Sequence, residues 1–403
     1  MSGTVIIGAS HSGVTLADLL RKGEYKEDIH IIDKDDYFPV ERPPLSKSFL
    51  CDNEQNINNK ILLRTEDWYK SNKIKYYFGL EVLKIDREKN NVILNNGDSL
   101  NYKNLVLALG ASPKFLPESI SKNSNYFVLR SLNDAKKIKS FLQPKSNAAV
   151  IGGGYIGLEI ASSLNKLGCR VDLIEMADRL LARVASPELS EYFLNLHTKN
   201  NINVFCNSGV NSVDKKDKFE ILIDQNKKLL SDIVIVGIGV KPNTSLAEEA
   251  GLKCKDGIIV NENYLTNDAN IFAIGDCAIN KDEYSIRIES VHNAQFSASR
   301  VASYILGNDL KDYEVPWFWS DQFDIKLQSA GLYKQGSTSV NRKGKREGSE
   351  SWWSFYQNKL VCIEAVNDPQ SFMIARQILQ RNLSIEIDQI KNNNTDLKSL
   401  LKA

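Results

Sequence analysis

The sequence is poor in residues that form redox pairs or metal sites. Its six cysteines include no CxxC or CxxxxC pair, which argues against a redox dithiol and against a zinc knuckle. Its four histidines show no metal-ligand spacing, so no metal is expected. No apolar run approaches the roughly 18 residues of a membrane helix, and an apolar strand begins almost at the N-terminus. We therefore expect a cytoplasmic protein with no membrane partner.

Neither sign of charge dominates the chain. Lys and Arg number 51 against 50 Asp and Glu, for a net charge of +1. A nucleic-acid-binding domain is usually clearly basic, so no nucleic-acid partner is expected, although a local basic patch could still dock an acidic protein. At 403 residues the chain exceeds one hydrophobic core, and we expect two or three domains.

A glycine-rich loop follows directly after the apolar run 4–7. It contains Gly8 and Gly13, with Ser10 where a second glycine is usual. Such a loop between a buried strand and a helix lets backbone N–H groups and the helix N-terminus face a pyrophosphate. A small hydroxyl residue still lets the backbone approach the phosphate, so we keep Ser10 among the binding residues.

A second loop of the same kind follows the apolar run 148–151. Here Gly152, Gly154 and Gly157 are all in place, and Glu175 lies 18 residues after Gly157. A carboxylate at that point accepts hydrogen bonds from an adenosine 2′-hydroxyl and repels a 2′-phosphate. No Arg or Lys stands among the next three residues, so the pattern indicates NADH rather than NADPH.

Two loops in one chain suggest that the protein binds two dinucleotides. The natural pair is a tightly bound flavin and a reversibly bound nicotinamide nucleotide. The acid that binds the flavin's ribose is expected about 20 residues after the first loop, and both Asp33 and Asp35 qualify. Asp276 follows Gly275 after another apolar strand, where a carboxylate can accept hydrogen bonds from a ribityl chain. These residues predict an FAD site.

Three longer segments make the pattern specific. They are RPPLSK at 42–47, ESVHNA at 289–294 and VPWFWSDQFDIKLQSAG at 315–331. With the two loops they resemble the NADH-dependent ferredoxin and rubredoxin reductases, the flavoprotein components of oxygenase and cytochrome monooxygenase systems. The likeness covers nearly the whole chain, and alignment on RPPLSK places the family's ribose-binding acid on Asp35.

The resemblance implies an α/β protein of the glutathione-reductase-like fold. Two Rossmann-like dinucleotide-binding domains are expected, followed by a C-terminal α+β domain. The FAD-binding domain is expected to be discontinuous, over residues 1–112 and 244–314. The NAD-binding domain is expected over 113–243, and the C-terminal reductase domain over 315–403.

The resemblance also implies roles for single residues. It places Lys47 near flavin N5, and Glu159 beside both Lys47 and the nicotinamide amide, which makes these two the expected catalytic residues. It places Arg42 near the pyrophosphate, and Val291 and Trp319 near the flavin ring. A fixed cation at the reactive edge of the ring would stabilise the anionic reduced flavin.

The function expected from all of this is transfer of electrons from NADH through FAD to a ferredoxin or rubredoxin that feeds an oxygenase. One alternative is a cysteine-dependent flavoenzyme such as an NADH oxidase or disulfide reductase. In this chain, however, RPPLSK occupies the zone where the reactive cysteine would stand, and Cys51 follows it without a partner. The other alternative is a redox-controlled interaction protein resembling apoptosis-inducing factor. That class would require a long insertion in the tail and a basic face, and the sequence shows neither.

Overall fold

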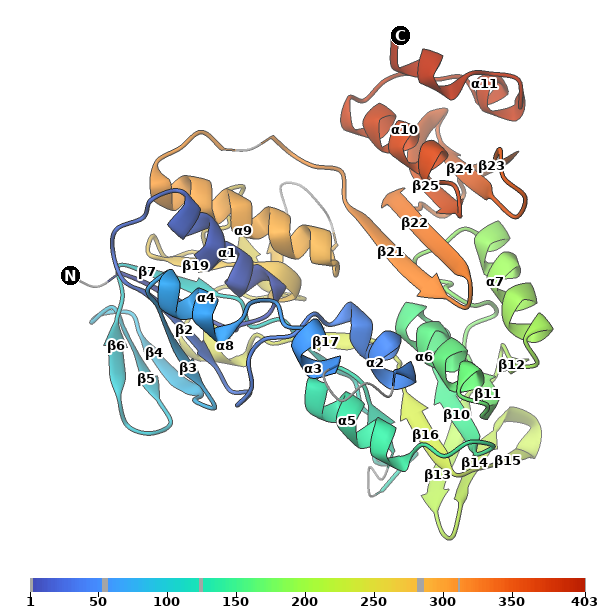
Figure 1. The fold of residues 1–403 in the computed structure, drawn as a ribbon, viewed down its shortest axis with the longest axis horizontal. Coiled ribbons are helices and arrows are strands. Elements are labelled where there is room, and N and C mark those ends of the chain that lie inside the picture. The colour runs from blue at the N-terminus through green and yellow to red at the C-terminus, as the bar shows by residue number, and fades with distance from the viewer. Residues whose placement is uncertain (1–2, 53–56, 123–125, 281–285, 311, 403) are drawn as a thin grey trace. The chain divides into compact units, whose positions relative to one another are not determined.

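The computed structural model describes residues 3–52, 57–122, 126–280, 286–310 and 312–402 (Figure 1). The chain divides into two compact units. Unit 1 comprises Met1–Glu41, Glu54–Ser112 and Val240–Glu314, and unit 2 comprises Arg42–Asn53, Pro113–Gly239 and Val315–Ala403. Each unit is therefore assembled from segments far apart in the sequence.

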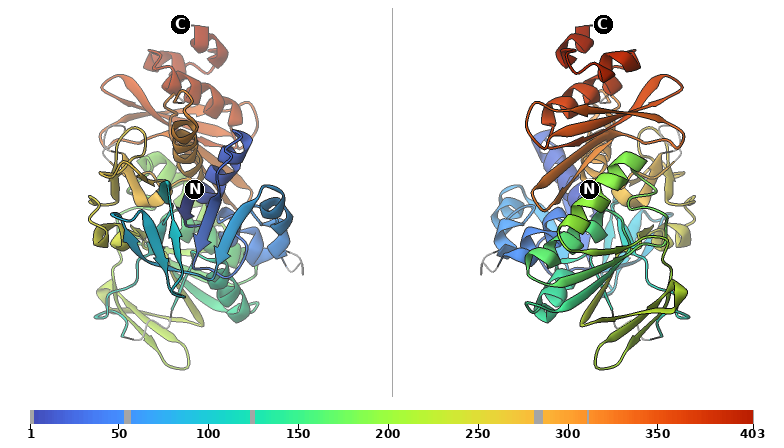
Figure 2. Two further views of the ribbon diagram at one scale, coloured as in Figure 1. Left: turned by 90° about the vertical axis from the view of Figure 1, so that its left-hand side faces the viewer. Right: turned by 90° about the vertical axis from the view of Figure 1, so that its right-hand side faces the viewer.

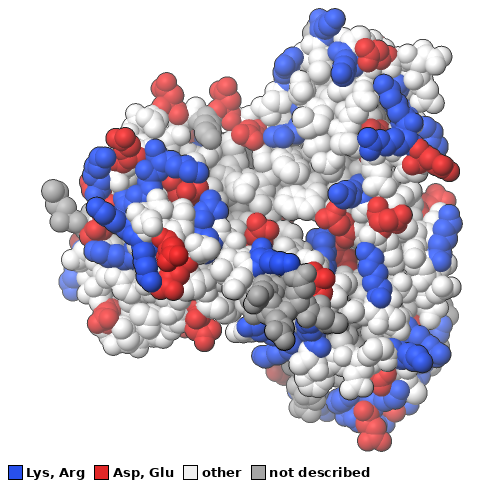
Figure 3. Space-filling view, viewed as in Figure 1, with Lys and Arg blue, Asp and Glu red and all other residues white. Residues whose placement is uncertain are grey.

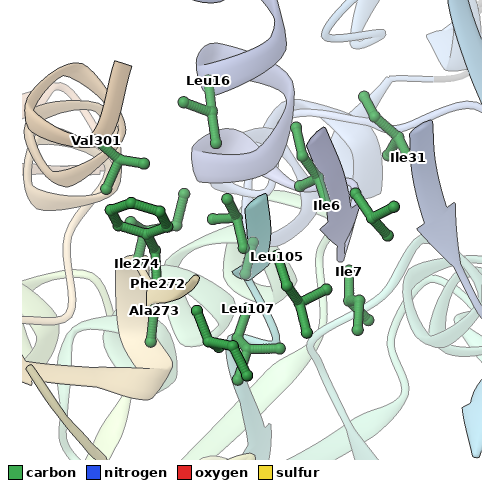
Figure 4. Close-up of a cluster of buried hydrophobic side chains, with 14 of the residues drawn as sticks. Ile6, Ile7, Leu16, Ile31, Leu105, Leu107, Phe272, Ala273, Ile274 and Val301 are labelled. Atoms are coloured by element: carbon green, nitrogen blue, oxygen red, sulfur yellow. The ribbon is translucent and has the colours of Figure 1, made fainter. Parts of the chain in front are cut away.

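A five-stranded parallel sheet forms the centre of unit 1, with the strand order β19-β7-β1-β2-β3. Strands β1, β7 and β19 are buried along almost their whole length, as in parallel sheets covered by helices. Helices α1 and α9 pack against each other, and Figure 4 shows their side chains meeting those of the strands in one buried cluster. The sheet strands and these two helices are β1 (Thr4–Ile7), β2 (Ile29–Asp33), β3 (Ile74–Phe78), β7 (Asn104–Leu107), β19 (Ile271–Ala273), α1 (His11–Lys22) and α9 (Val291–Leu306).

The rest of unit 1 consists of short elements around this sheet. An antiparallel sheet is formed by β4, β5 and β6, and residues 95–98, whose sequence Asn-Asn-Gly-Asp is typical of a hairpin turn, join β5 to β6. Two further strand pairs are β8 with β17 and β18 with β20. These elements are α3 (Ile57–Lys60), α4 (Glu66–Ser71), β4 (Val82–Asp86), β5 (Asn91–Leu94), β6 (Ser99–Asn101), β8 (Ala111–Pro113), β17 (Val240–Pro242), α8 (Ser245–Glu249), β18 (Ile258–Val260), the 3-10 turn η3 (Gly275–Cys277) and β20 (Ala278–Asn280).

Unit 2 contains a second five-stranded parallel sheet, with the order β12-β11-β10-β16-β9. An antiparallel sheet of β13, β14 and β15 follows β12 in the chain. The elements up to this point are η1 (Pro43–Ser46), α2 (Ser48–Cys51), β9 (Phe127–Val128), α5 (Leu132–Phe141), β10 (Asn147–Ile151), α6 (Tyr155–Lys166), β11 (Arg170–Ile174), α7 (Pro187–Lys199), β12 (Asn203–Phe205), β13 (Val210–Lys215), β14 (Phe219–Ile223), η2 (Asp224–Asn226), β15 (Lys227–Ser231) and β16 (Ile233–Val236).

The C-terminal part of unit 2 is an antiparallel sheet covered by helices. The strand order is β21-β22-β25-β24-β23, and α10 packs on β22 and β25 (Figure 2). The buried side chains of Leu327, Trp352 and Val366 belong to the same hydrophobic cluster as the helices and strands of the parallel sheet. The elements are β21 (Trp317–Gln322), β22 (Ile325–Gly331), β23 (Thr338–Lys343), β24 (Glu350–Tyr356), β25 (Lys359–Val366), α10 (Pro369–Gln380), α11 (Ile387–Lys391) and η4 (Leu397–Lys402).

The two parallel sheets and the C-terminal antiparallel sheet with its helices confirm the predicted fold class. Within the described ranges, no helix combines the length and the apolar character that crossing a bilayer requires.

Candidate functional site

The two glycine loops have the same backbone geometry. Gly8 and Gly152, at the ends of β1 and β10, have φ values of 108° and 114°, which strongly favour glycine. A Cβ atom on Gly13 would lie 2.0 Å from the Gly8 carbonyl oxygen, and one on Gly157 would lie 2.0 Å from that of Gly152. Only glycine therefore lets α1 and α6 approach their loops this closely.

The middle position of the two loops is occupied by different residues, Ser10 and Gly154. Each is the N-cap of the helix that follows, and neither helix has a side-chain cap hydrogen bond. No atom lies within 4 Å of a Cβ built on Gly154, so the fold itself accommodates a small side chain at this position. Both helix N-termini are thus left without a side-chain cap, as a phosphate-binding site requires.

Glu175 follows β11 and is held against the second loop. Its Oε2 accepts a hydrogen bond from the Gly153 backbone N–H (2.5 Å), and its Oε1 accepts one from the Ala177 N–H (2.7 Å). These two bonds fix the carboxylate beside the loop, where the adenosine ribose of a dinucleotide binds in this fold.

Asp33 occupies the corresponding place in unit 1. At the end of β2, its Oδ2 accepts a hydrogen bond from the Ala9 N–H of the first loop (2.6 Å), and its Oδ1 accepts one from the Asp35 N–H (3.0 Å). The carboxylate of Asp35 instead accepts a hydrogen bond from the Tyr37 hydroxyl (2.8 Å). Asp33 is therefore the structural counterpart of Glu175, whereas Asp35 lies two residues further along the loop.

The third expected element of the flavin site, Asp276, lies in η3 directly after β19. The neighbouring Gly275 donates its N–H to the Ser297 hydroxyl of α9 (3.1 Å), and a Cβ on Gly275 would lie 2.9 Å from Ser12 Oγ of α1. The turn therefore packs between the first glycine loop's helix and α9, whose first residue is Val291. Unit 1 thus brings together the start of α1, the turn η3 that contains Asp276, and α9.

In unit 2 the carboxylate of Glu159, on α6, receives three donors. Lys47 Nζ lies 2.8 Å from Oε2, the Ser46 hydroxyl donates to Oε2 (2.5 Å), and the Ser320 hydroxyl donates to Oε1 (2.7 Å). Glu159 is 3% exposed. A buried ion pair is costly unless hydrogen bonds satisfy its remaining polar atoms, and here the two hydroxyl groups do so.

The segment that carries Lys47 is fastened to the helices of unit 2. Its η1 turn begins with two prolines, which favour the first positions of such a turn. The Ser163 hydroxyl of α6 donates to the Ser46 carbonyl (2.7 Å), and Lys139 Nζ of α5 donates to the Phe49 carbonyl (2.9 Å). These bonds hold the Lys47 ammonium group beside Glu159.

Two other expected site residues of unit 2 have different surroundings. Trp319 precedes Ser320 on β21, so its side chain points to the opposite face of the strand. Its ring lies 5.6 Å from that of Trp317, and the guanidinium of Arg376 lies 5.5 Å from the Trp317 ring centroid. Arg42 donates to the Arg130 carbonyl (3.3 Å). The structure does not place Arg42 or Trp319 in the Glu159 cluster.

Sequence reasoning missed Ser46 and Ser320. Both lie inside motifs that carried the resemblance, RPPLSK and FWSDQ, directly beside Lys47 and Trp319. A hydroxyl residue adjacent to each expected flavin residue was the available signal, but nothing local shows that both hydroxyls reach one carboxylate.

The cysteines offer no reactive thiol pair. All six are free. Burial raises the pKa of the thiols of Cys169, Cys206, Cys254, Cys277 and Cys362, to about 11 for Cys277. A thiol that works at a flavin needs a lowered pKa, because the thiolate is the nucleophile. In the part of the chain that the structure describes, no three His, Cys, Asp or Glu residues gather as a metal site.

Comparison with known proteins decides what these loops and motifs belong to. Residues 3–298 match the model of the pyridine nucleotide-disulphide oxidoreductase family, and residues 317–401 match that of the reductase C-terminal domain. The chain belongs to the pyridine nucleotide-disulphide oxidoreductase family. Relatives that span almost the whole chain confirm its resemblance to the ferredoxin and rubredoxin reductases.

Two curated relatives cover almost the whole chain. Putidaredoxin reductase of Pseudomonas putida is 34% identical over 99% of this chain and 96% of its own length. Rhodocoxin reductase of Rhodococcus erythropolis is 34% identical over 98% of this chain and 93% of its own. Among solved structures, a covalent putidaredoxin reductase–putidaredoxin complex matches with a TM-score of 0.94 and 33% identity, covering 100% of this chain and 98% of the other.

This member of the family is an FAD-dependent oxidoreductase whose cofactors are FAD and NADH. The residues present fit two dinucleotides. Each parallel sheet has a glycine loop that a Cβ would obstruct, a helix N-terminus without a side-chain cap, and a carboxylate fixed to the loop.

The loop geometry yields a matched pair of variants in one loop. We expect Gly157→Ser to lower the free energy of unfolding by about 1–3 kcal/mol, because its Cβ would overlap the Gly152 carbonyl oxygen. Gly154→Ser, which reproduces the Ser10 position, should change it by less than about 0.5 kcal/mol. Urea denaturation of the purified proteins measures both. Equal losses in the two variants would contradict the proposed equivalence of Ser10 and Gly154.

Proposed function

We propose that this protein passes electrons from NADH through FAD to a ferredoxin or rubredoxin that feeds an oxygenase, and that it works in the cytoplasm. The observation that carries the proposal is the buried Glu159–Lys47 pair, with Ser46 and Ser320 as its further donors. Three of these four residues lie in the motifs on which the resemblance rests. The names of the relatives, putidaredoxin reductase and rhodocoxin reductase, support a small redox protein as the acceptor.

The proposal assigns FAD to residues 1–112 and 244–314, and NADH to residues 113–243. In the FAD part, the loop of Gly8, Ser10 and Gly13 holds the pyrophosphate, and Asp276 accepts hydrogen bonds from the ribityl chain. Asp33 is the better candidate than Asp35 for the ribose, because its contacts with the first loop match those of Glu175 with the second. The C-terminal reductase domain, 315–403, supplies Ser320 and Trp319.

FAD, when bound, accepts a hydride from NADH and gives up electrons one at a time, which an iron–sulfur or iron protein can receive. The residues of this chain then have positioning and electrostatic roles. Lys47 places a fixed positive charge at the reactive edge of the flavin, and Glu159 holds that charge and faces the nicotinamide amide. By the family resemblance, Arg42 is assigned to the pyrophosphate, and Val291 and Trp319 are assigned to the flavin ring.

The NADH assignment predicts the nucleotide preference. Loss of the carboxylate in Glu175→Ala removes hydrogen bonds to the 2′-hydroxyl, and we expect kcat/KM for NADH to fall about 5- to 150-fold. Glu175→Arg should shift the preference toward NADPH, since it replaces a repelling charge with an attracting one. Steady-state kinetics with both nucleotides measures the effect. A wild-type protein that used NADPH as well as NADH would refute the role of Glu175.

The role of Lys47 is tested by flavin reduction. In Lys47→Ala we expect the protein to keep its FAD but to be reduced by NADH more slowly, because the cation acts at the ring and not at the phosphates. Stopped-flow bleaching of the oxidised flavin band gives the rate. Lys137→Ala, at an exposed lysine on α5, serves as the control and should match the wild type. If Lys47→Ala also matched it, Lys47 would have no part in the reaction.

The acceptor is tested by electron delivery. Residues 315–403 contain 12 Lys and Arg against 9 Asp and Glu, and Figure 3 shows many of these cations on one face of the C-terminal part. An acidic ferredoxin should be steered by such charges, so NADH-driven cytochrome c reduction should rise with added ferredoxin and fall with increasing salt. If oxygen or a disulfide, but no ferredoxin or rubredoxin, accelerates NADH oxidation, the proposed function fails.

A further inference from the structure

Buried side chains in unit 2 form a linear chain of hydrogen bonds, the His197 file. It runs from His197 on α7 through Gln322 and Ser320 to Glu159. His197 Nε2 lies 2.8 Å from Gln322 Oε1, Gln322 Nε2 donates to Ser320 Oγ (3.1 Å), and Ser320 Oγ donates to Glu159 Oε1 (2.7 Å). His197 and Ser320 are 0% exposed, and Gln322 is 1% exposed. The function proposed above uses neither His197 nor Gln322.

The direction of every bond in this file follows from its last member. An ionised carboxylate only accepts, so the Ser320 hydroxyl must donate its hydrogen to Glu159. The lone pair of Ser320 then takes a hydrogen from the Gln322 amide nitrogen, which leaves the amide oxygen of Gln322 facing His197. His197 must therefore carry its hydrogen on Nε2, and it acts as a donor.

The imidazole of His197 is suited to donating one hydrogen bond to the Gln322 amide oxygen. Burial lowers its pKa, which keeps the ring neutral, so it brings no second positive charge to compete with Lys47. Its Nδ1 is buried and has no hydrogen-bond partner among the residues that the structure describes. An unpaired buried nitrogen is destabilising, so stability alone does not account for a histidine here.

Another contact fixes the end of the strand that carries the file. Phe323, which follows Gln322, donates its N–H to the Ser162 hydroxyl of α6 (2.7 Å), and Lys166 of α6 donates to the Phe323 carbonyl (2.8 Å). The Phe323 ring meets the edge of the His197 ring at 5.3 Å. The backbone of β21 is thus anchored independently, and what remains for His197 to fix is the orientation of the Gln322 amide.

We propose that His197 and Gln322 are positioning residues for hydride transfer, because they keep the Gln322 amide oxygen away from Ser320, where it would compete with Glu159 for the hydroxyl hydrogen, and thereby hold the Glu159 carboxylate against Lys47. Without the His197 N–H, the Gln322 amide is free to turn and present its oxygen to Ser320. The Ser320 hydroxyl would then have two competing acceptors, Gln322 Oε1 and Glu159 Oε1, and its hydrogen bond to Glu159 would be weakened. The inference rests on the proposed roles of Lys47 and Glu159.

The test compares two substitutions at His197 in the FAD-loaded protein. His197→Phe keeps a ring against Phe323 but removes the donor, whereas His197→Gln retains a terminal N–H. In anaerobic stopped-flow reduction at saturating NADH, we expect His197→Phe to lower the limiting rate about 3- to 10-fold without changing the Kd of NADH. His197→Gln should stay within about twofold of the wild type. Ser329→Ala, a buried hydroxyl on β22 outside the file, is the control and should leave the rate unchanged.

A double-mutant cycle separates positioning from general loosening of the fold. If His197 acts through Glu159, then His197→Phe should have no further effect in a Glu159→Gln background. An equal slowing in both backgrounds, or an unchanged rate in His197→Phe alone, would overturn the inference. If Glu159→Gln is itself as fast as the wild type, the proposed role of the ion pair fails as well, so the two failures are distinguishable.

Should His197→Phe lose its FAD, Ser320 allows the same comparison one bond nearer to Glu159. Ser320→Ala is expected to slow flavin reduction, and Ser320→Thr, which restores a hydroxyl, to recover it. Recovery by Thr supports the file, and slow reduction in both variants would contradict it.

Discussion

The ion pair between Glu159 and Lys47 is the interaction on which the architecture of unit 2 depends. Glu159 is a buried carboxylate, and an isolated charge in that position would be strongly destabilising. It is tolerated because the RPPLSK segment supplies Lys47 and Ser46, and β21 supplies Ser320. One charged group on α6 thus joins a segment near residue 45 to a strand near residue 320, and each would leave an unpaired polar atom if it moved away.

The need to satisfy the Glu159 carboxylate also gives strand β21 a part in the site. Alternate residues of a strand point to opposite faces, so Ser320 and Gln322 face the buried file while Trp319 and Asp321 face the other way. A single strand can therefore hold the Glu159 carboxylate on one face and present an aromatic ring on the other. This arrangement accounts for the density of distinctive residues in the FWSDQ motif.

Much of the fold was predictable because the two glycine loops are local signals. Apolar patterning in the sequence predicts strands at 4–7 and 29–33 and a helix at about 291–306, and the structure has these bounds. The sequence also predicts that the helix after the second loop ends at Gly168, which has a left-handed φ of 82°. The sequence predicts helices that start at about Gly13 and Gly157, whereas α1 begins at His11 and α6 at Tyr155. The last glycine of each loop lies inside the first helical turn, where its missing Cβ admits the loop carbonyl, and does not mark the helix start.

The site was predictable only in part. The loops and Glu175 follow from spacing, but the pairing of Lys47 with Glu159 was available only through family resemblance, since 112 residues separate them. Ser46, Ser320, Gln322 and His197 could not be found, because a serine or a buried histidine has no local pattern that shows which carboxylate it serves. Long-range side-chain geometry, set by how α6, α7 and β21 pack, decides these contacts.

A crystal structure of the protein with FAD and NAD⁺ bound tests the central claim most directly. The account predicts that Lys47 Nζ and the Glu159 carboxylate remain paired, with both groups against the flavin ring and the nicotinamide amide. It predicts that Ser46 and Ser320 still donate to Glu159. The account is wrong if Lys47 instead points into solvent, or if the pair lies away from both rings. In that case the pair of Glu159 and Lys47 has only a structural role.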